Sequence, residues 1–134
     1  MIQAYIVDDR EVDRYTARRR LAKTGRFTAV HEAEDGRIFL DKLFDAEPKL
    51  DEPGPLVLMD ISMPFMDGFE TVEALRARMI ESGWPENVVV VIVSSSGAPK
   101  DKQRAAETPL VRGYFEKPIK VDDVEVMLSL MGAA

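Results

Sequence analysis

The chain contains no cysteine and only one histidine among its 134 residues. Without cysteine, disulfide bonds, zinc–thiolate sites and cysteine nucleophiles are excluded. The single histidine, His31, lies inside a strand-like segment. This position favours a hydrogen-bonded sheet residue over a phosphohistidine.

Long apolar runs and excess positive charge are also missing. No stretch approaches the roughly 20 apolar residues that span a bilayer, and Met1–Ala4 lacks the basic region and cleavage pattern of a signal peptide. The net charge is −6 and the isoelectric point about 4.9, which argues against direct nucleic-acid binding because such binding depends on neutralising phosphates. We therefore expect a cytoplasmic protein that binds neither membrane nor nucleic acid.

The length and composition are those of one globular domain. Hydrophobic residues make up 46% of the chain and charged residues 31%, which is ordinary for a folded protein. A chain of this size can bury a proper core. We find no internal repeat and no linker, and we expect a single domain over residues 1–134.

Strand-like and helix-like segments alternate along the chain. We predict strands at Ile2–Val7, Phe27–Glu32, Leu56–Met59, Val88–Val93 and Gly113–Glu116. We predict helices at Glu11–Lys23, Arg37–Ala46, Asp67–Ser82, Pro99–Glu107 and Val121–Met131. The polar stretch Glu47–Pro55 is predicted to be a connection. Five βα units in succession predict an α/β doubly wound (βα)5 sandwich, in which a five-stranded parallel sheet carries helices on both faces.

Polar residues directly follow four of the predicted strands. They are Asp8 and Asp9 after the first strand, Asp60 after the third, Ser94 after the fourth and Lys117 after the fifth. Because ligands of open α/β sheets bind at the carboxyl ends of the strands, we expect these side chains to converge at one edge.

The predicted cluster suits a divalent cation and a phosphoryl group. Mg²⁺ prefers oxygen ligands, and Asp8, Asp9 and Asp60 are the carboxylate donors. Without a cation, these carboxylates would repel one another and raise their pKa values. Lys117 supplies a positive charge for phosphoryl oxygens, and the Ser94 hydroxyl can donate a hydrogen bond. An aspartate can itself act as the nucleophile toward a phosphoryl group.

The chain resembles the receiver domains of two-component response regulators, typified by stand-alone chemotaxis-type receivers. Five short motifs carry this resemblance, in order and suitably spaced: Val7-Asp8-Asp9, Leu58–Pro64, Met66-Asp67-Gly68, Val93-Ser94-Ser95 and Tyr114–Pro118. Each motif is weak by itself, but the five together are highly specific. The resemblance implies a flavodoxin-like fold with strand order 2-1-3-4-5.

The resemblance also implies the roles of the acidic residues. Asp60 is expected to be the phosphoacceptor. Asp9 is expected to bind Mg²⁺ directly, and Asp8 directly or through water. The backbone carbonyl of Ser62 is expected to be the third protein ligand of the metal.

Further roles are implied for the switch and for the basic residue. Lys117 is expected to pair with the phosphoryl group, and the Lys117–Pro118 bond to be a cis peptide, which is tolerable before proline. Ser94 is expected to be the switch hydroxyl, with Ser95 as the competing candidate among three consecutive serines. Tyr114 is expected to be the switch aromatic.

By this resemblance, the chain is a signalling receiver that catalyses only its own phosphoryl acceptance and dephosphorylation. A sensor histidine kinase or a histidine phosphotransfer protein would phosphorylate it. An output protein or a second copy would then bind the face formed by the fourth helix, fifth strand and fifth helix.

Three alternatives remain open at the level of sequence. The chain could be a Mg²⁺-dependent phosphohydrolase with an aspartyl nucleophile, although Ser62 stands where such enzymes commonly have a second carboxylate. It could be a pseudo-receiver that acts as a constitutive interaction domain, although no acceptor or metal carboxylate is missing. Locally, Asp8 and Asp9 could simply be an N-cap pair, since Asp is favoured at that position.

Overall fold

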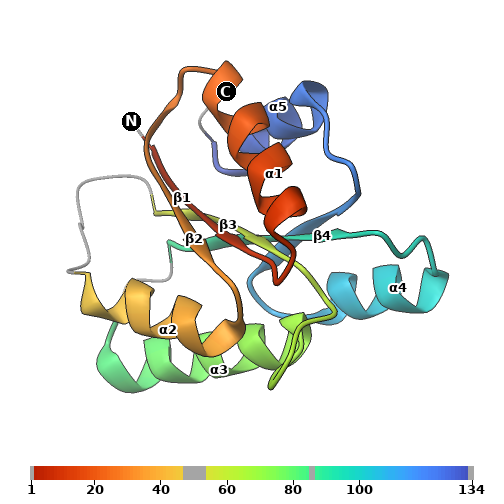
Figure 1. The fold of residues 1–134 in the computed structure, drawn as a ribbon. Coiled ribbons are helices and arrows are strands. Elements are labelled where there is room, and N and C mark those ends of the chain that lie inside the picture. Colours follow the sequence, from red (N-terminus) through yellow and green to blue (C-terminus); the bar gives the residue numbers. More distant parts are fainter. Residues whose placement is uncertain (1, 47–53, 85–86, 133–134) are drawn as a thin grey trace.

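The computed structural model describes residues 2–46, 54–84 and 87–132, in which strands and helices alternate (Figure 1). The strands are β1 (Ile2–Val7), β2 (Phe27–Ala33), β3 (Leu56–Met59), β4 (Val89–Ser94) and β5 (Val111–Glu116). The helices are α1 (Glu11–Lys23), α2 (Gly36–Asp45), α3 (Gly68–Ser82), α4 (Pro99–Glu107) and α5 (Val121–Leu130). The predicted connection Glu47–Pro55 lies almost entirely outside the described residues.

The five strands form one parallel sheet in the order β2-β1-β3-β4-β5. The predicted fold class and strand order are thus confirmed. The sequence placed the start of β5 at Gly113, two residues too late. Val111 pairs with Val90 and Gly113 with Val91, so a register irregularity skips Arg112 and interrupts the apolar pattern that the prediction followed.

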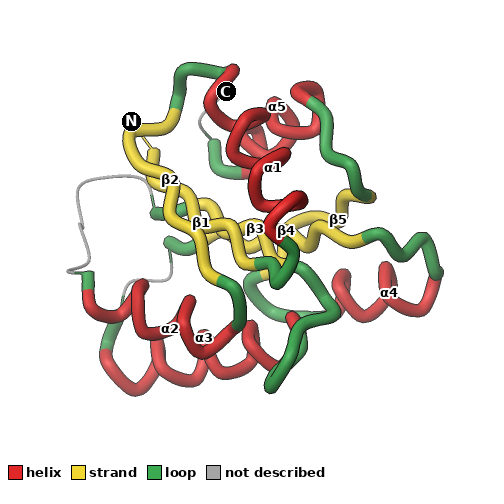
Figure 2. Tube along the Cα trace, viewed as in Figure 1, coloured by secondary structure: helices red, strands yellow, loops and turns green. Residues whose placement is uncertain are grey.

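Both faces of the sheet are covered by helices, because successive side chains of a strand point to opposite faces. In Figure 2, α1 and α5 lie above the sheet, and α2 and α3 lie below it. On the first side Leu21 and Met127 pack into one core cluster, and on the other Phe39 and Phe69 pack into a second. The strand β3 is buried on both sides, which accounts for its continuous apolar sequence.

The chain between β3 and α3 is held tightly against the sheet. Asp67 caps α3 by accepting a hydrogen bond from the Glu70 N–H at 2.8 Å. Gly68 donates its N–H to the Ile61 carbonyl at 2.8 Å. A β-carbon at Gly68 would overlap the backbone carbonyl of Asp60, so only glycine permits this close approach. The loop that follows β3 is therefore fixed beside the strand end.

Helix α4 has only one buried residue, Ala105. It is tied to its neighbours mainly through charged groups at its surface. Lys102 Nζ lies 2.9 Å from Glu116 Oε1, and the Arg104 guanidinium lies 4.3 Å from the ring centre of Phe69. This helix is therefore held by little apolar contact.

No helix in the described part of the chain has the length and apolarity needed to cross a membrane.

Candidate functional site

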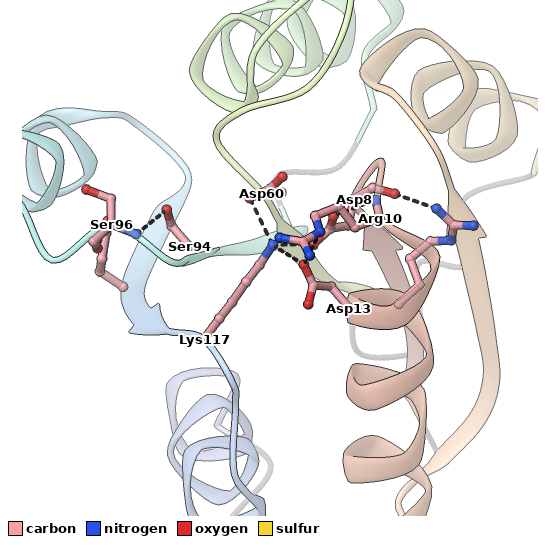
Figure 3. A network of polar contacts seen from close by, with 9 residues as sticks. Asp8, Arg10, Asp13, Asp60, Ser94, Ser96 and Lys117 are labelled. Atoms are coloured by element: carbon pink, nitrogen blue, oxygen red, sulfur yellow. Dashed lines mark hydrogen bonds and ion pairs between the residues drawn. The ribbon is translucent and has the colours of Figure 1, made fainter.

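Four strand ends meet at the carboxyl edge of the sheet (Figure 3). The backbone pairing continues one residue past the strands: the Asp60 N–H donates to the Val7 carbonyl, and the Lys117 N–H donates to the Ser94 carbonyl, both at 2.9 Å. These bonds fix the ends of neighbouring strands, and with them the predicted site residues, side by side. The predicted convergence at one edge is therefore confirmed.

Three carboxylates form a compact group at this edge. One carboxylate oxygen from each of Asp8, Asp9 and Asp60 lies within 4.8 Å of the others. Asp8 and Asp60 are buried, whereas Asp9 is exposed. An all-oxygen donor set with one open side fits Mg²⁺, which usually keeps several waters. The residues thus fit the metal that the sequence predicted.

Lys117 lies at the centre of this acidic group. Its Nζ is 2.6 Å from Asp8 Oδ2, 3.0 Å from Asp13 Oδ2 and 3.2 Å from Asp60 Oδ1. Burial by itself lowers the pKa of Lys117, but the hydrogen bonds to Asp8 and Asp13 and the charge of Asp60 raise it well above its usual range. The carboxylates around Lys117 therefore stabilise its ammonium form. Its peptide bond to Pro118 is cis, as predicted.

Asp60 carries a perturbed carboxyl group. Burial and then the negative charge of Asp8 raise its pKa to about 6, although Lys117 acts in the opposite direction. A carboxylate in this position is costly to ionise without a compensating cation. The site therefore favours an added positive charge beside Asp60.

The three serines after β4 have different environments. Ser94 is buried, and its Oγ accepts a hydrogen bond from the Ser96 N–H at 3.0 Å. Ser95 is exposed. The Ser94 carbonyl also accepts a hydrogen bond from the Lys117 N–H, which ties the end of β4 to the site, and the switch role of Ser94 stays a prediction.

Tyr114 and Ser96 connect the site to α4. The Tyr114 hydroxyl donates to the Ser96 carbonyl at 2.6 Å, and the Ser96 hydroxyl donates to Asp101 of α4 at 2.6 Å. Sequence reasoning missed Ser96 and Asp101. Their only sequence signal was a serine close to the start of a predicted helix.

The N-cap alternative for Asp8 and Asp9 is wrong. The N-cap of α1 is Arg10, and no side chain caps this helix end. Asp8 instead accepts a hydrogen bond from the Arg10 N–H at 2.9 Å, so its carboxylate shapes the turn between β1 and α1. Sequence reasoning also missed Asp13. The available signal was its place one helical turn after Asp9, close to the end of β1.

Two other predicted residues lie where expected. Ser62 is exposed in the loop after β3, beside Asp60, and its carbonyl remains a predicted metal ligand. His31 lies on β2, with Nε2 3.3 Å from Gln3 Oε1 and its ring stacked on Tyr5. This placement supports its interpretation as a sheet residue.

A doubly wound sheet with an acidic cluster and a half-buried lysine at its carboxyl edge defines the receiver class of signalling domain. The chain belongs to the response regulator receiver domain family, whose model matches residues 4–129.

Individual relatives agree with this assignment. Two-component response regulator ORR41 of Oryza sativa subsp. japonica is 34% identical over 129 residues, which cover 96% of this chain and 93% of that protein. Hybrid signal transduction histidine kinase E of Dictyostelium discoideum is 34% identical over 122 residues, but the match covers only 6% of its length. The structure of Vibrio cholerae chemotaxis protein CheY4 is 26% identical, with a TM-score of 0.74 and coverage of 96% of this chain and 97% of that one.

Proposed function

We propose that the chain is a phosphorylatable receiver in which Asp60 accepts a phosphoryl group from a histidine kinase or a histidine phosphotransfer protein. The observation that carries this proposal is the position of Asp60, which is clustered with the carboxylates of Asp8 and Asp9 and lies 3.2 Å from the ammonium of Lys117. In the reaction, an Asp60 oxygen attacks phosphorus, a P–O bond forms, and the P–N bond to the donor histidine breaks.

The protein's own contribution is to place charge around the transferring group, because phosphoryl transfer depends mainly on positioning and electrostatic stabilisation. Asp8, Asp9, Asp60 and the Ser62 carbonyl would hold Mg²⁺, which supplies positive charge for the phosphoryl oxygens. Lys117 donates to one of these oxygens from the side of β5. Buried Ser94 can rotate from its bond with Ser96 and donate to another.

The proposed output is a change of the face formed by α4, β5 and α5. Phosphorylation adds about −1.5 to −2 charge beside Lys117 and Ser94. Movement of Ser94 breaks its bond with Ser96, whose carbonyl holds Tyr114 and whose hydroxyl holds α4 through Asp101. Because little apolar contact holds α4, this helix can respond. An output protein or a second copy then binds this face of the phosphorylated form.

The phosphohydrolase alternative is less well supported. Position 62, two residues after the proposed nucleophile, is an exposed serine and not a carboxylate. The chain then has no acid–base group at this position to release a product quickly. A turnover assay on phosphate esters separates the two functions, because a receiver should show no multiple turnover of stable esters.

The direct test is phosphorylation from acetyl phosphate in the presence of Mg²⁺. Intact-mass measurement should detect one added phosphoryl group on the wild-type protein, and none on Asp60→Asn or in excess EDTA. Stoichiometric uptake by Asp60→Asn would show that another residue is the acceptor. Absence of uptake by the wild-type protein, with the fold intact, would favour the constitutive interaction domain.

A further inference from the structure

Asp13 contacts the site but has no part in the proposed metal binding. Its Oδ2 accepts a hydrogen bond from Lys117 Nζ at 3.0 Å, across 104 positions of sequence. It comes from the first turn of α1, whereas the three clustered carboxylates come from the loops after β1 and β3. In Figure 3, Asp13 and Asp60 approach the lysine from different sides. Asp13 is thus a fourth carboxylate at this site, beside the half-buried ammonium of Lys117.

The ammonium of Lys117 has no donor to spare. A lysine carries three N–H donors, and three carboxylates lie within 3.2 Å of Nζ, those of Asp8, Asp13 and Asp60. A phosphoryl oxygen that binds Lys117 must take a donor from one of them. Asp13 therefore shares the group that a bound phosphoryl anion needs.

Among the described residues, the other cation paired with Asp13 is Arg10, which lies farther from it than Lys117 does. Arg10 Nε lies 3.6 Å from Asp13 Oδ2, but the Arg10 side chain is 70% exposed, so this pair is weak. Arg14 on the same helix is already engaged, since it donates to Glu32 at 3.1 Å and to the Asp8 carbonyl at 2.8 Å. The negative charge of Asp13 is thus balanced mainly by Lys117.

We propose that Asp13 is a positioning residue that restrains Lys117 and lowers the affinity of the site for the phosphoryl group. This inference rests on the proposed receiver function and adds a residue that regulates phosphorylation of the site. A carboxylate at this distance repels an added anion and attracts an added cation. Asp13 therefore biases the resting site toward Mg²⁺ and against the phosphoryl anion, and so sets how readily the phosphorylated state forms.

Removing the charge of Asp13 should affect the binding of a cation and of an anion in opposite directions. A residue that only maintained the shape of the site would not show this pattern. Calorimetry measures the dissociation constant for Mg²⁺ alone, and then for beryllofluoride at saturating Mg²⁺, as a mimic of the phosphoryl group. Asp13→Asn keeps an oxygen for Lys117 and removes the charge. Asp13→Ala removes both the oxygen and the charge, and it should change each of the two dissociation constants in the same direction as Asp13→Asn does.

For both variants we expect beryllofluoride to bind more tightly by about three- to tenfold and Mg²⁺ to bind more weakly by about two- to fivefold, as loss of one nearby charge predicts. Glu11→Gln is the matched control, because Glu11 lies exposed in the same helical turn and changes the same charge. It should shift both constants much less. Thermal unfolding in EDTA checks that each variant is folded.

Each other outcome overturns the proposal. Weaker binding of both ligands would show that Asp13 only maintains the shape of the site. Unchanged binding, or equal effects of Glu11→Gln and Asp13→Asn, would show that its contact with Lys117 has no specific consequence. Failure of the wild-type protein to bind beryllofluoride would overturn the receiver function and this inference with it. If the wild-type protein binds beryllofluoride and Asp13→Asn has the same dissociation constants for both ligands, this inference alone is overturned.

Discussion

The hydroxyl of Tyr114 donates a hydrogen bond to the backbone carbonyl of Ser96 at 2.6 Å. This bond joins β5 to the loop between β4 and α4. The ring of Tyr114 packs at the edge of the core cluster shared by α2 and α3. The phenol is therefore the polar end of an otherwise apolar contact, and it holds the loop that carries Ser96 and directly follows Ser94.

Removing this hydroxyl should loosen the loop. Tyr114→Phe keeps the ring and loses one hydrogen bond, which should lower the free energy of unfolding by about 1 kcal/mol. Amide hydrogen exchange should become faster at Ser96 and in the first turn of α4. Tyr15→Phe is the control, because Tyr15 is 59% exposed and its hydroxyl accepts a hydrogen bond from Arg19 of the same helix. Unchanged exchange in Tyr114→Phe would show that the bond does not restrain the loop.

The raised pKa of Asp60 predicts how stability depends on pH. Because its pKa rises from 3.8 to about 6, Asp60 binds its proton more tightly in the folded chain than in the unfolded one. Its contribution to the free energy of unfolding of metal-free protein is therefore complete below pH 3.8 and is lost as the pH rises to about 6. The loss amounts to at most about 3 kcal/mol.

Asp60→Asn should remove this loss. In urea denaturation with EDTA, the variant should gain stability over the wild-type protein as the pH rises from 4 to 6.5. At pH 7 it should be the more stable of the two by about 1–3 kcal/mol. Comparison with the wild-type protein cancels the titration of the other carboxyl groups. If the difference in the free energy of unfolding between the two proteins stayed constant over this pH range, the raised pKa of Asp60 would be contradicted.

Loss of Asp9 should affect the metal and not the fold. Asp9 is exposed and caps no helix, so Asp9→Ala should change the free energy of unfolding of metal-free protein by less than about 0.5 kcal/mol, or raise it by relieving repulsion. Mg²⁺ binding, followed by calorimetry or by Mn²⁺ broadening of amide signals, should be lost. Asp41→Ala, at an exposed position on α2, should leave it unchanged. Clear destabilisation would instead indicate a structural role for Asp9.

The proposed movement of Ser94 on phosphorylation predicts a particular pattern of amide chemical shifts. Beryllofluoride with Mg²⁺ should shift signals in the wild-type protein at the site and across α4, β5 and α5. Ser94→Ala should still bind beryllofluoride, but with smaller shifts across those three elements, since a ligand moves an equilibrium only through its differential affinity for the two states. Ser95→Ala, at an exposed position, is the control. Shifts confined to the metal loops of the wild-type protein would contradict the proposed output face.

Gly68 should be required for the position of Asp60. Alanine at this position would force the Asp60 carbonyl to move, because the added β-carbon would overlap it. We expect Gly68→Ala to lower the free energy of unfolding by about 1–3 kcal/mol and to slow phosphorylation from acetyl phosphate. Gly97→Ala is a control for stability, since the atoms nearest its added β-carbon would belong to the flexible end of Glu116, the closest at 3.2 Å. Equal stability of the two variants would show that the loop can yield.

The sequence by itself determined the order of the elements and the residues at the strand ends. Apolar runs of four to six residues, each followed by a polar residue, identified β1, β3 and β4. In a parallel sheet all strands end at the same edge, so Asp8, Asp60 and Lys117 could be brought together without coordinates. Short apolar runs carry this information because a strand buried on both faces needs apolar residues at every position.

Only the tertiary structure decided which groups share Lys117. Asp13 meets Lys117 because α1 docks beside α5 on the same face of the sheet, and nothing in the local pattern of either segment encodes that contact. The same holds for the bond between Tyr114 and Ser96 and for the skipped residue that moves the start of β5 to Val111. Periodicity reports which side of an element is buried, whereas strand register and helix docking set the distances between side chains on different elements.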